Sequence, residues 1–462
     1  MVNGHNRSSN KITYVNKKRS ALCLHQNVKF IYYKSMTTMK GILMDYSVAI
    51  TLGFLVFAIV MFALEKIPLS ITAMIVAVGL HLSGVLTAAE AFKGFVDSNV
   101  ILFIAMFIIG AAFFETGVAV DVGNVVNKFA KNETILIIAI MMLTGIMSGF
   151  LSNTGTAAVM IPVVIGICKK GGFNQTKFLM PIVFAAAMGG NISMIGSPGN
   201  MIANSNLQEA GLGSFSFFAY GEVGLPMLIV GTLFYAFIGK RFLPEVPTRE
   251  PDPNYQKNAD FSHVPVWKKW VAGLVLVLTI AAMIFEKQIG VSLAVSAWVG
   301  ALVIVATGVI TENEAVKSID MKTILLFVGS LALGTAMVKS GAGAYIANLI
   351  VDALGDTPNP LALLAVLFFL SVFMTNFMSN TADVALLAPI GLSLASQLGF
   401  DPKAILVAIV ISSSLAYGTP IGMPANTMVY NVAGYSFKDY VKAGVPLIVV
   451  SAIVSLVLLP IL

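Results

Sequence analysis

Two copies of one polar triplet stand out in this chain, Ser152-Asn153-Thr154 and Ser379-Asn380-Thr381, each between two apolar runs. Ser, Asn and Thr favour the start of a helix, where backbone N–H groups are unpaired and the positive end of the helix dipole is exposed. Hydroxyl, amide and N–H donors at such a start suit a carboxylate or another oxyanion. Amide and carbonyl oxygens at the same turn suit a small alkali cation.

Other polar features repeat together with the triplets. A hydroxyl lies four residues before each triplet, at Ser148 and at Thr375. Two apolar runs each break at a cluster of Gly and Pro, at 196–200 and 418–426. Such breaks free backbone carbonyls inside a bilayer, where they can coordinate cations. A triplet opposite a broken helix, present twice, predicts two cation sites that flank one substrate site.

Cationic side chains that could neutralise a buried anion are missing from the predicted spans. No Lys or Arg lies in the interior of any span, and burial of an unpaired dianion is costly. We therefore expect the neutralising charge to enter as bound cations. Sodium is favoured over protons, because only Asp383 and His81 could serve as embedded proton carriers. The residue that corresponds to Asp383 in the first hairpin is the neutral Thr156.

The composition is that of a membrane protein. Hydrophobic residues make up 57% of the 462 residues and charged residues 11%, against about 25% charged in ordinary soluble domains. Residues 1–44 hold eight of the 28 Lys and Arg and no acid, so the remaining 20 face 22 acids. The net charge of +6 therefore reflects an N-terminal tail and gives no reason to expect nucleic-acid binding. Two cysteines and four scattered histidines offer no redox or metal-ligand spacing.

The apolar runs predict an all-α polytopic fold with about 11 transmembrane spans and two re-entrant hairpins. The arms of the first hairpin run over 17 residues (134–150) and 14 residues (155–168), whereas a crossing helix needs about 20. The expected parts are a basic tail at 1–45 with a weak candidate span inside it, a first repeat at 46–240 with its hairpin at 134–168, a cytoplasmic linker at 241–267, and a second repeat at 268–462 with its hairpin at 360–396.

The two repeats match residue by residue at a nearly constant offset. The matched pairs include Glu90 with Glu314, Lys93 with Lys317, Pro162 with Pro389, Asn200 with Asn426, and Tyr220 with Tyr440. Five crossings per repeat force the second repeat to be inverted. With the linker in the cytoplasm, 16 loop Lys and Arg fall inside and four outside, in line with the positive-inside tendency. We expect a multi-pass protein of the bacterial inner membrane with a cytoplasmic N-terminus and a periplasmic C-terminus.

On these features the chain resembles the divalent anion/sodium symporter family, specifically its bacterial sodium-dependent dicarboxylate transporters, over roughly residues 46–462. The resemblance rests on the paired Ser-Asn-Thr motifs, the Ser-Pro-Gly-Asn and Met-Pro-Ala-Asn breaks and the inverted repeat. It implies sodium-coupled symport of C4 dicarboxylates such as succinate, malate or fumarate into the cell. It also implies a homodimer that works as an elevator within the lipid bilayer.

The resemblance further implies roles for individual residues. The substrate carboxylates would be held by Ser152, Asn153, Thr154, Ser379, Asn380, Thr381 and Pro424. At least two sodium ions, one at each hairpin tip, would be bound by Ser148, Ser152, Asn153 and Gly199 at the first tip and by Thr375, Asn380 and Ala425 at the second.

Other interpretations stay open at this point. The same scaffold suits a sodium- or proton-coupled carrier of another oxyanion, such as citrate or sulfate, or a cation/proton antiporter. Hydroxyl and amide contacts fix oxyanions but not the spacing between them, so C4 acids cannot be ranked against citrate. An anion channel is a further class. An enzyme is disfavoured, because the chain has no Ser/His/Asp constellation, metal cluster or phosphate loop.

Overall fold

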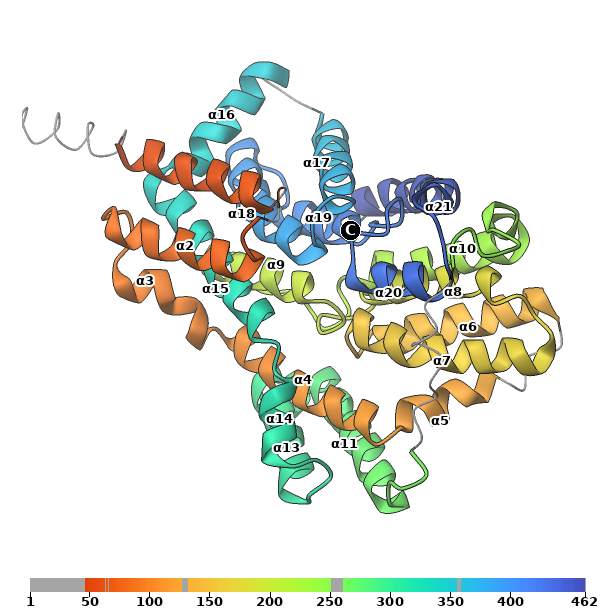
Figure 1. The fold of residues 1–462 in the computed structure, drawn as a ribbon. Helices are drawn as coiled ribbons and strands as arrows, with labels where there is room; N and C mark the ends of the chain where they lie inside the picture. The colour runs from red at the N-terminus through yellow and green to blue at the C-terminus, as the bar shows by residue number, and fades with distance from the viewer. Residues whose placement is uncertain are drawn as a thin grey trace, which may run out of the picture.

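The computed structural model describes residues 46–62, 64, 66–126, 132–250, 261–354 and 359–461. Within these ranges every regular element is a helix, which confirms the all-α fold expected from the apolar runs (Figure 1). The expected tail with its weak first span (1–45) lies outside the described residues, as does the middle of the linker at 251–260.

The first half of the chain is helical wherever long apolar runs predicted a span. Its elements are a helix at Tyr46–Phe62, α2 (Leu69–Leu82), α3 (Ala88–Phe92), η1 (Lys93–Val96), α4 (Ser98–Glu115), α5 (Val118–Asn124), α6 (Glu133–Ser148), α7 (Asn153–Gly171), η3 (Gln175–Lys177), α8 (Leu179–Gly189), α9 (Pro198–Glu209), α10 (Gly221–Phe237) and η4 (Gly239–Phe242).

The second half follows the same order. Its elements are α11 (Val266–Ile284), α12 (Glu286–Ile289), α13 (Leu293–Ala306), α14 (Glu312–Ser318), α15 (Met321–Ser340), α16 (Ala342–Leu354), α17 (Pro360–Thr375), α18 (Asn380–Leu398), α19 (Pro402–Ser413), α20 (Pro424–Val432), α21 (Phe437–Leu458) and η6 (Leu459–Ile461). Two helices at corresponding positions in the two halves begin in the same way. Thr87 with Glu90 and Thr311 with Glu314 each form a capping box, which begins α3 and α14.

Apolar side chains cover the outer faces of this bundle. Among the described helices, six are long and apolar enough to cross a bilayer, and seven shorter apolar helices accompany them. On α21, Val445, Val449, Ile453 and Val457 recur every fourth residue and are 44–60% exposed. A contiguous apolar stripe of this kind is unfavourable in water and suits contact with lipid. The chain is a multi-span membrane protein.

The downstream arm of the first hairpin is longer than its apolar run suggested. The upstream arms α6 and α17 have 16 residues, and the downstream arms α7 and α18 have 19. The expectation of a 14-residue arm at 155–168 was wrong, because α7 begins at Asn153 and continues through Lys169 and Lys170. Polar end residues lengthen a helix that a hydropathy count cuts short. The depth of the tips in a bilayer therefore does not follow from arm length.

Helices from the two halves mix in two groups (Figure 1). In the first group α2 packs on α15, and α4 packs on α11 and α13. In the second group α6 packs on α8 and α10, α17 and α18 pack on α19, and α10 packs on α21. The short helices α5 and α16 contact the downstream arms α7 and α18. In the chain α5 directly follows α4, and α16 directly follows α15. Each downstream arm is thus in contact with a short helix that continues a helix of the first group.

The second segments of the two broken helices cross to the opposite repeat. The segment α9 packs on α18 and α19, whereas α20 packs on α7 and α8. Between the breaks, Ser414 Oγ donates a hydrogen bond to Asn191 Oδ1 at 3.1 Å. Each hairpin therefore faces a segment supplied by the other half of the chain.

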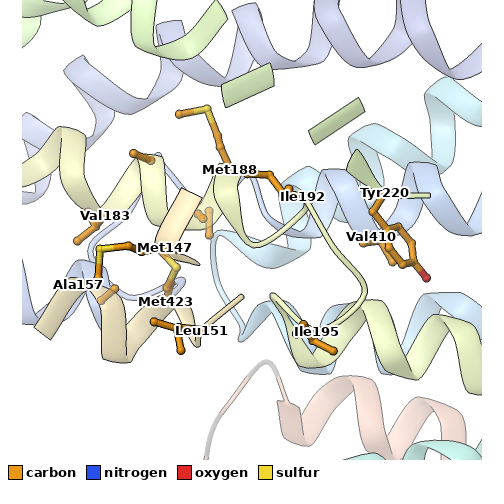
Figure 2. Packing of buried hydrophobic residues seen from close by; sticks show 14 of the residues in the cluster. Met147, Leu151, Ala157, Val183, Met188, Ile192, Ile195, Tyr220, Val410 and Met423 are labelled. Carbon is orange, nitrogen blue, oxygen red and sulfur yellow. The ribbon is translucent and has the colours of Figure 1, made fainter. Parts of the chain in front are cut away.

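The breaks lie inside the main hydrophobic core. Met147 and Leu151 of the first hairpin, Ile192 and Ile195 of the first break and Met423 of the second belong to one cluster of buried side chains (Figure 2). All five are less than one tenth exposed. Close packing at this density leaves little room for movement, so the backbone carbonyls of the breaks are held in place.

Candidate substrate and cation site

Each triplet begins a helix, as its residue types predicted. Ser152 is the N-cap of α7 and accepts the backbone N–H of Gly155 at 3.1 Å. Ser379 is the N-cap of α18 and accepts the N–H of Ala382 at 3.2 Å. One serine cap cannot satisfy all the free N–H groups of a first turn. Both helix starts therefore keep donors and the positive dipole end for an anion.

Both helix starts face one cavity of about 510 Å³. The seven residues expected to hold substrate, namely both triplets and Pro424, all line it. The first group of helices also lines the cavity, with the apolar side chains of Phe103 and Phe107 of α4 and Leu326 of α15 and with polar residues at the starts of α2 and α15. A cavity of this size takes a small metabolite. Its lining fits a ligand with polar ends and a hydrocarbon middle.

A cluster of oxygens surrounds the first tip behind the cavity. The inner atom of the Asn153 side-chain amide lies 2.7 Å from Ser148 Oγ and 3.2 Å from the carbonyl oxygens of Ala186 and Gly196. With its nitrogen inward, the amide donates to all three. With its oxygen inward, it joins a hydroxyl and two carbonyls in a shell that a hard cation would bind. Both orientations use the same contacts, so a turn of the amide exchanges a hydrogen-bonded arrangement for a set of oxygens alone.

The second tip repeats this arrangement. The inner atom of the Asn380 amide lies 2.9 Å from Thr375 Oγ1 and 3.2 Å from the carbonyl oxygens of Ser413 and Gly422. Thr375 Oγ1 also donates to the Ser413 carbonyl. The set of a hydroxyl, an amide and two carbonyls is thus built twice, in two hairpins that share one cavity. This duplication is the strongest geometric sign of a paired cation site.

Two expected cation ligands lie close to the breaks without a described contact to the amides. Gly199 and Ala425 are the second residues of α9 and α20, and both are fully buried. A Cβ at Gly199 would lie 3.0 Å from Val384 in the second hairpin, so this backbone approaches the opposite repeat. Their assignment as ligands stays a prediction.

One buried asparagine holds the backbone of each break, a role that sequence analysis did not assign. Asn200 Nδ2 donates to the carbonyls of Gly190 and Ser193, both at 2.8 Å, and Tyr220 donates to the Asn200 carbonyl. The corresponding Asn426 Nδ2 binds the carbonyls of Ala416 and Thr419 at 2.6 and 3.0 Å, and Tyr440 donates to the Asn426 carbonyl. In both asparagines the buried Oδ1 has no described partner. The sequence pattern that points to both asparagines is the repeated Pro-x-Asn, at 198–200 and 424–426.

A cation does reach the cavity from the protein, contrary to expectation. Lys322 and Asp320 both line the cavity and both are exposed at its rim. The sequence placed Lys322 in a loop before a span at 323. Instead, α15 begins at Met321, and Asp320 caps it by accepting the N–H groups of Lys322 and Thr323. The first turn of this helix therefore carries the lysine to the cavity.

The two candidate proton carriers lie away from the cavity lining. His81 packs at the end of α2, where its Nδ1 lies 3.1 Å from the Leu86 carbonyl. Asp383 is fully buried in the second hairpin behind the triplet. Within the described residues, no group of three or more His, Cys, Asp or Glu that could hold a metal ion is found. Any cation at the tips therefore relies on neutral oxygens.

Comparisons with known proteins identify the kind of molecule that carries this arrangement. A family model described as "Citrate transporter" matches residues 59–382 and, in a second match, residues 280–462. An uncharacterized transporter of Escherichia coli K12, YfbS, is 24% identical, with 89% of this chain and 98% of that protein covered. The sodium-dependent dicarboxylate transporter SdcS of Staphylococcus saprophyticus is 23% identical, with 82% of this chain and 79% of that protein covered.

A solved structure shows the same architecture. The YdaH transporter of Alcanivorax borkumensis superposes with a TM-score of 0.62 at 16% sequence identity. The match covers 89% of this chain and 97% of that one. At this level of identity the likeness shows the fold alone.

Proposed function

This chain belongs to the citrate transporter family of secondary transporters, and on that premise we propose that it imports C4 dicarboxylates such as succinate, malate or fumarate together with sodium ions. The observation that carries the proposal is the pair of oxygen clusters around Asn153 and Asn380 beside one cavity. Two helix starts can each hold one carboxylate, and two cations can neutralise the dianion. The sodium-dependent dicarboxylate transporter among the relatives supports the same substrate and ion.

The proposed coupling follows from the contacts of the triplets. Asn153 and Asn380 each contribute to the cavity and to an oxygen cluster, so a bound cation orients the amide that meets the substrate. Sodium then raises the affinity for the substrate, and by linkage the substrate raises the affinity for sodium by the same factor. The second group of helices, which holds both hairpins, would carry the site across the bilayer as an elevator, in a homodimer of the bacterial inner membrane. The N-terminus would be cytoplasmic and the C-terminus periplasmic.

Uptake of labelled succinate into proteoliposomes tests this function. With an inward sodium gradient we expect accumulation, and each coupled sodium ion adds about a factor of ten under a tenfold gradient. Replacing external sodium with choline removes this driving force and serves as the control. Equal uptake in sodium and choline would exclude sodium coupling. If unlabelled citrate or sulfate competes and fumarate and malate do not, the transported anion is another oxyanion and not a C4 dicarboxylate.

Citrate is a second candidate that the rim lysine favours. Lys322 offers a cation at the open side of the cavity, where a third carboxylate would lie, and the family model carries the description of a citrate transporter. Asp320 beside it weakens the attraction for an anion. The two substrates therefore predict different responses when Lys322 is neutralised.

We expect Lys322→Gln to raise the KM for the transported anion about fivefold, since an exposed charge at about 4 Å contributes roughly 1 kcal/mol. The maximal rate should change little, because Lys322 lies at the rim and outside both oxygen clusters. If the natural substrate is citrate, the KM for citrate rises more than the KM for succinate. Lys317→Gln is the matched control, because Lys317 is exposed and absent from the cavity lining. If Lys322→Gln and Lys317→Gln have the same KM, Lys322 does not contribute to substrate binding.

A further inference from the structure

One buried carboxyl group has no part in the site described so far. Asp383 lies in the first turn of α18, two residues after the triplet, and is fully buried. Its Oδ2 accepts a hydrogen bond from Ser371 Oγ at 2.5 Å, and Ser371 Oγ also lies 3.4 Å from the Ile409 carbonyl oxygen. The other carboxyl oxygen, Oδ1, is buried and has no described partner. The sequence offered Asp383 as a possible proton carrier, and the residue lies outside the cavity lining.

No described cationic side chain compensates this carboxyl group. The helix α18 packs against α9, α15, α16, α17 and α19. The described charged side chains on these helices are Glu209, Lys322, Lys339 and Lys403, and none of them contacts Asp383. Glu209 pairs with Lys93, and Lys339 pairs with Glu90. A carboxylate held by one neutral hydroxyl in an apolar interior costs several kcal/mol. A small cation at Oδ1 would remove this cost.

The first hairpin shows that its fold does not need an acid here. Thr144 and Thr156 occupy the positions that correspond to Ser371 and Asp383. Both threonine side chains are fully buried, and neither hydroxyl has a described partner. The two hairpins otherwise share the cap, the amide and the oxygen cluster. The carboxyl group is therefore an addition to the second hairpin rather than a requirement of the hairpin architecture.

From this asymmetry we infer that Asp383 is the anionic ligand of an additional monovalent-cation site in the second hairpin. The cation binds at Oδ1, while the Ser371 hydroxyl, which also lies near the Ile409 carbonyl, holds the other carboxyl oxygen in place. The cation is a proton or an alkali ion, since either neutralises a carboxylate. The inference rests on the proposed function, in which two cations at the tips balance a dianion. A third cation that moves with them gives one net positive charge per substrate imported.

Charge-to-substrate coupling in proteoliposomes tests this site. Reversal potentials for succinate flux are measured with a sodium gradient at fixed pH, and with a pH gradient at fixed sodium. The wild type should move one net positive charge inward per succinate, and Asp383→Asn should move none. The ion is identified by which gradient dependence changes in the variant. The sodium dependence falls from three ions to two if the site binds sodium, and the pH dependence disappears if it binds a proton. Thr156→Ser is the matched control and should keep the wild-type ratio. An unchanged ratio in Asp383→Asn would overturn the proposal.

A second experiment tests the cation site without transport of the substrate. In purified protein, binding of radioactive sodium and the infrared carbonyl band of a protonated carboxyl group are compared between wild type and Asp383→Asn. We expect the wild type either to bind one more sodium per chain or to show a carboxyl band that the variant lacks. If neither difference is found, the site is excluded. If this experiment succeeds while the wild type carries no succinate, the proposed substrate fails and the cation site stands. Asp383→Thr, which restores the residue of the first hairpin, replaces Asp383→Asn if that variant is misfolded.

Discussion

Asn153→Ala and Asn380→Ala each reduce sodium-dependent succinate uptake to the background of empty liposomes, while the protein remains folded and inserted in the membrane. Each substitution removes the one side chain that reaches both the cavity and an oxygen cluster. It leaves Ser148 or Thr375 and two carbonyl oxygens without the amide between them. Loss of a ligand and of its orienting contacts lowers apparent sodium affinity by on the order of 100-fold or more.

The measurement is initial uptake rate against sodium concentration, with monodisperse elution and thermal unfolding as tests of folding. The two variants should behave alike, because the two clusters have the same composition. Asn376→Ala is an informative comparison, since Asn376 also lies near the second tip. Its amide binds the Val372 and Leu415 carbonyls rather than lining the cavity. Wild-type uptake by well-folded Asn153→Ala protein would remove the first tip from the site.

Gly190→Ala weakens sodium binding at the first tip by about tenfold or more. A Cβ at Gly190 would lie 2.5 Å from Asn153 Oδ1 and 3.0 Å from its Nδ2. The backbone itself accepts alanine, because Gly190 has φ −55° and ψ −19°. Only the amide or the break can yield, and overpacking of this kind costs about 1–3 kcal/mol.

Gly166→Ala provides the control for this substitution. Gly166 lies within α7, and a Cβ there meets nothing within 4 Å. Alanine in a helix interior is favourable by up to about 1 kcal/mol relative to glycine, so this variant should keep wild-type uptake and gain slight stability. Sodium titrations of both variants at saturating succinate make the comparison. If Gly190→Ala shows the sodium dependence of the wild type, the amide of Asn153 does not set cation affinity.

The chemistry of the tips could be predicted from sequence because it resides in side chains. Ser152 and Ser379 cap helices, and the triplets meet at one cavity, as their residue types and repetition indicated. The Gly and Pro clusters at 196–200 and 418–426 lie where α8 and α19 give way to α9 and α20. Because each motif occurs twice, it could be recognised from a single sequence.

Other features left no sequence signal of their own. The carbonyls of Ala186 and Ser413 join the oxygen clusters through backbone atoms, which any residue supplies. Lys322 reaches the cavity because α15 starts two residues before its apolar run, and such boundaries depend on capping by Asp320 rather than on hydropathy. The burial of Asp383 depends on how α17, α18 and α19 pack together, which spacing along one helix does not reveal.

The exchange of α9 and α20 between the repeats has a consequence for synthesis of the chain. The first hairpin is made early, yet the segment that covers α7 and α8 is α20, at 424–432. Until that segment is inserted, the polar tip at Asn153 lacks its cover within the membrane. The first repeat therefore gains this contact only after most of the second repeat has been made.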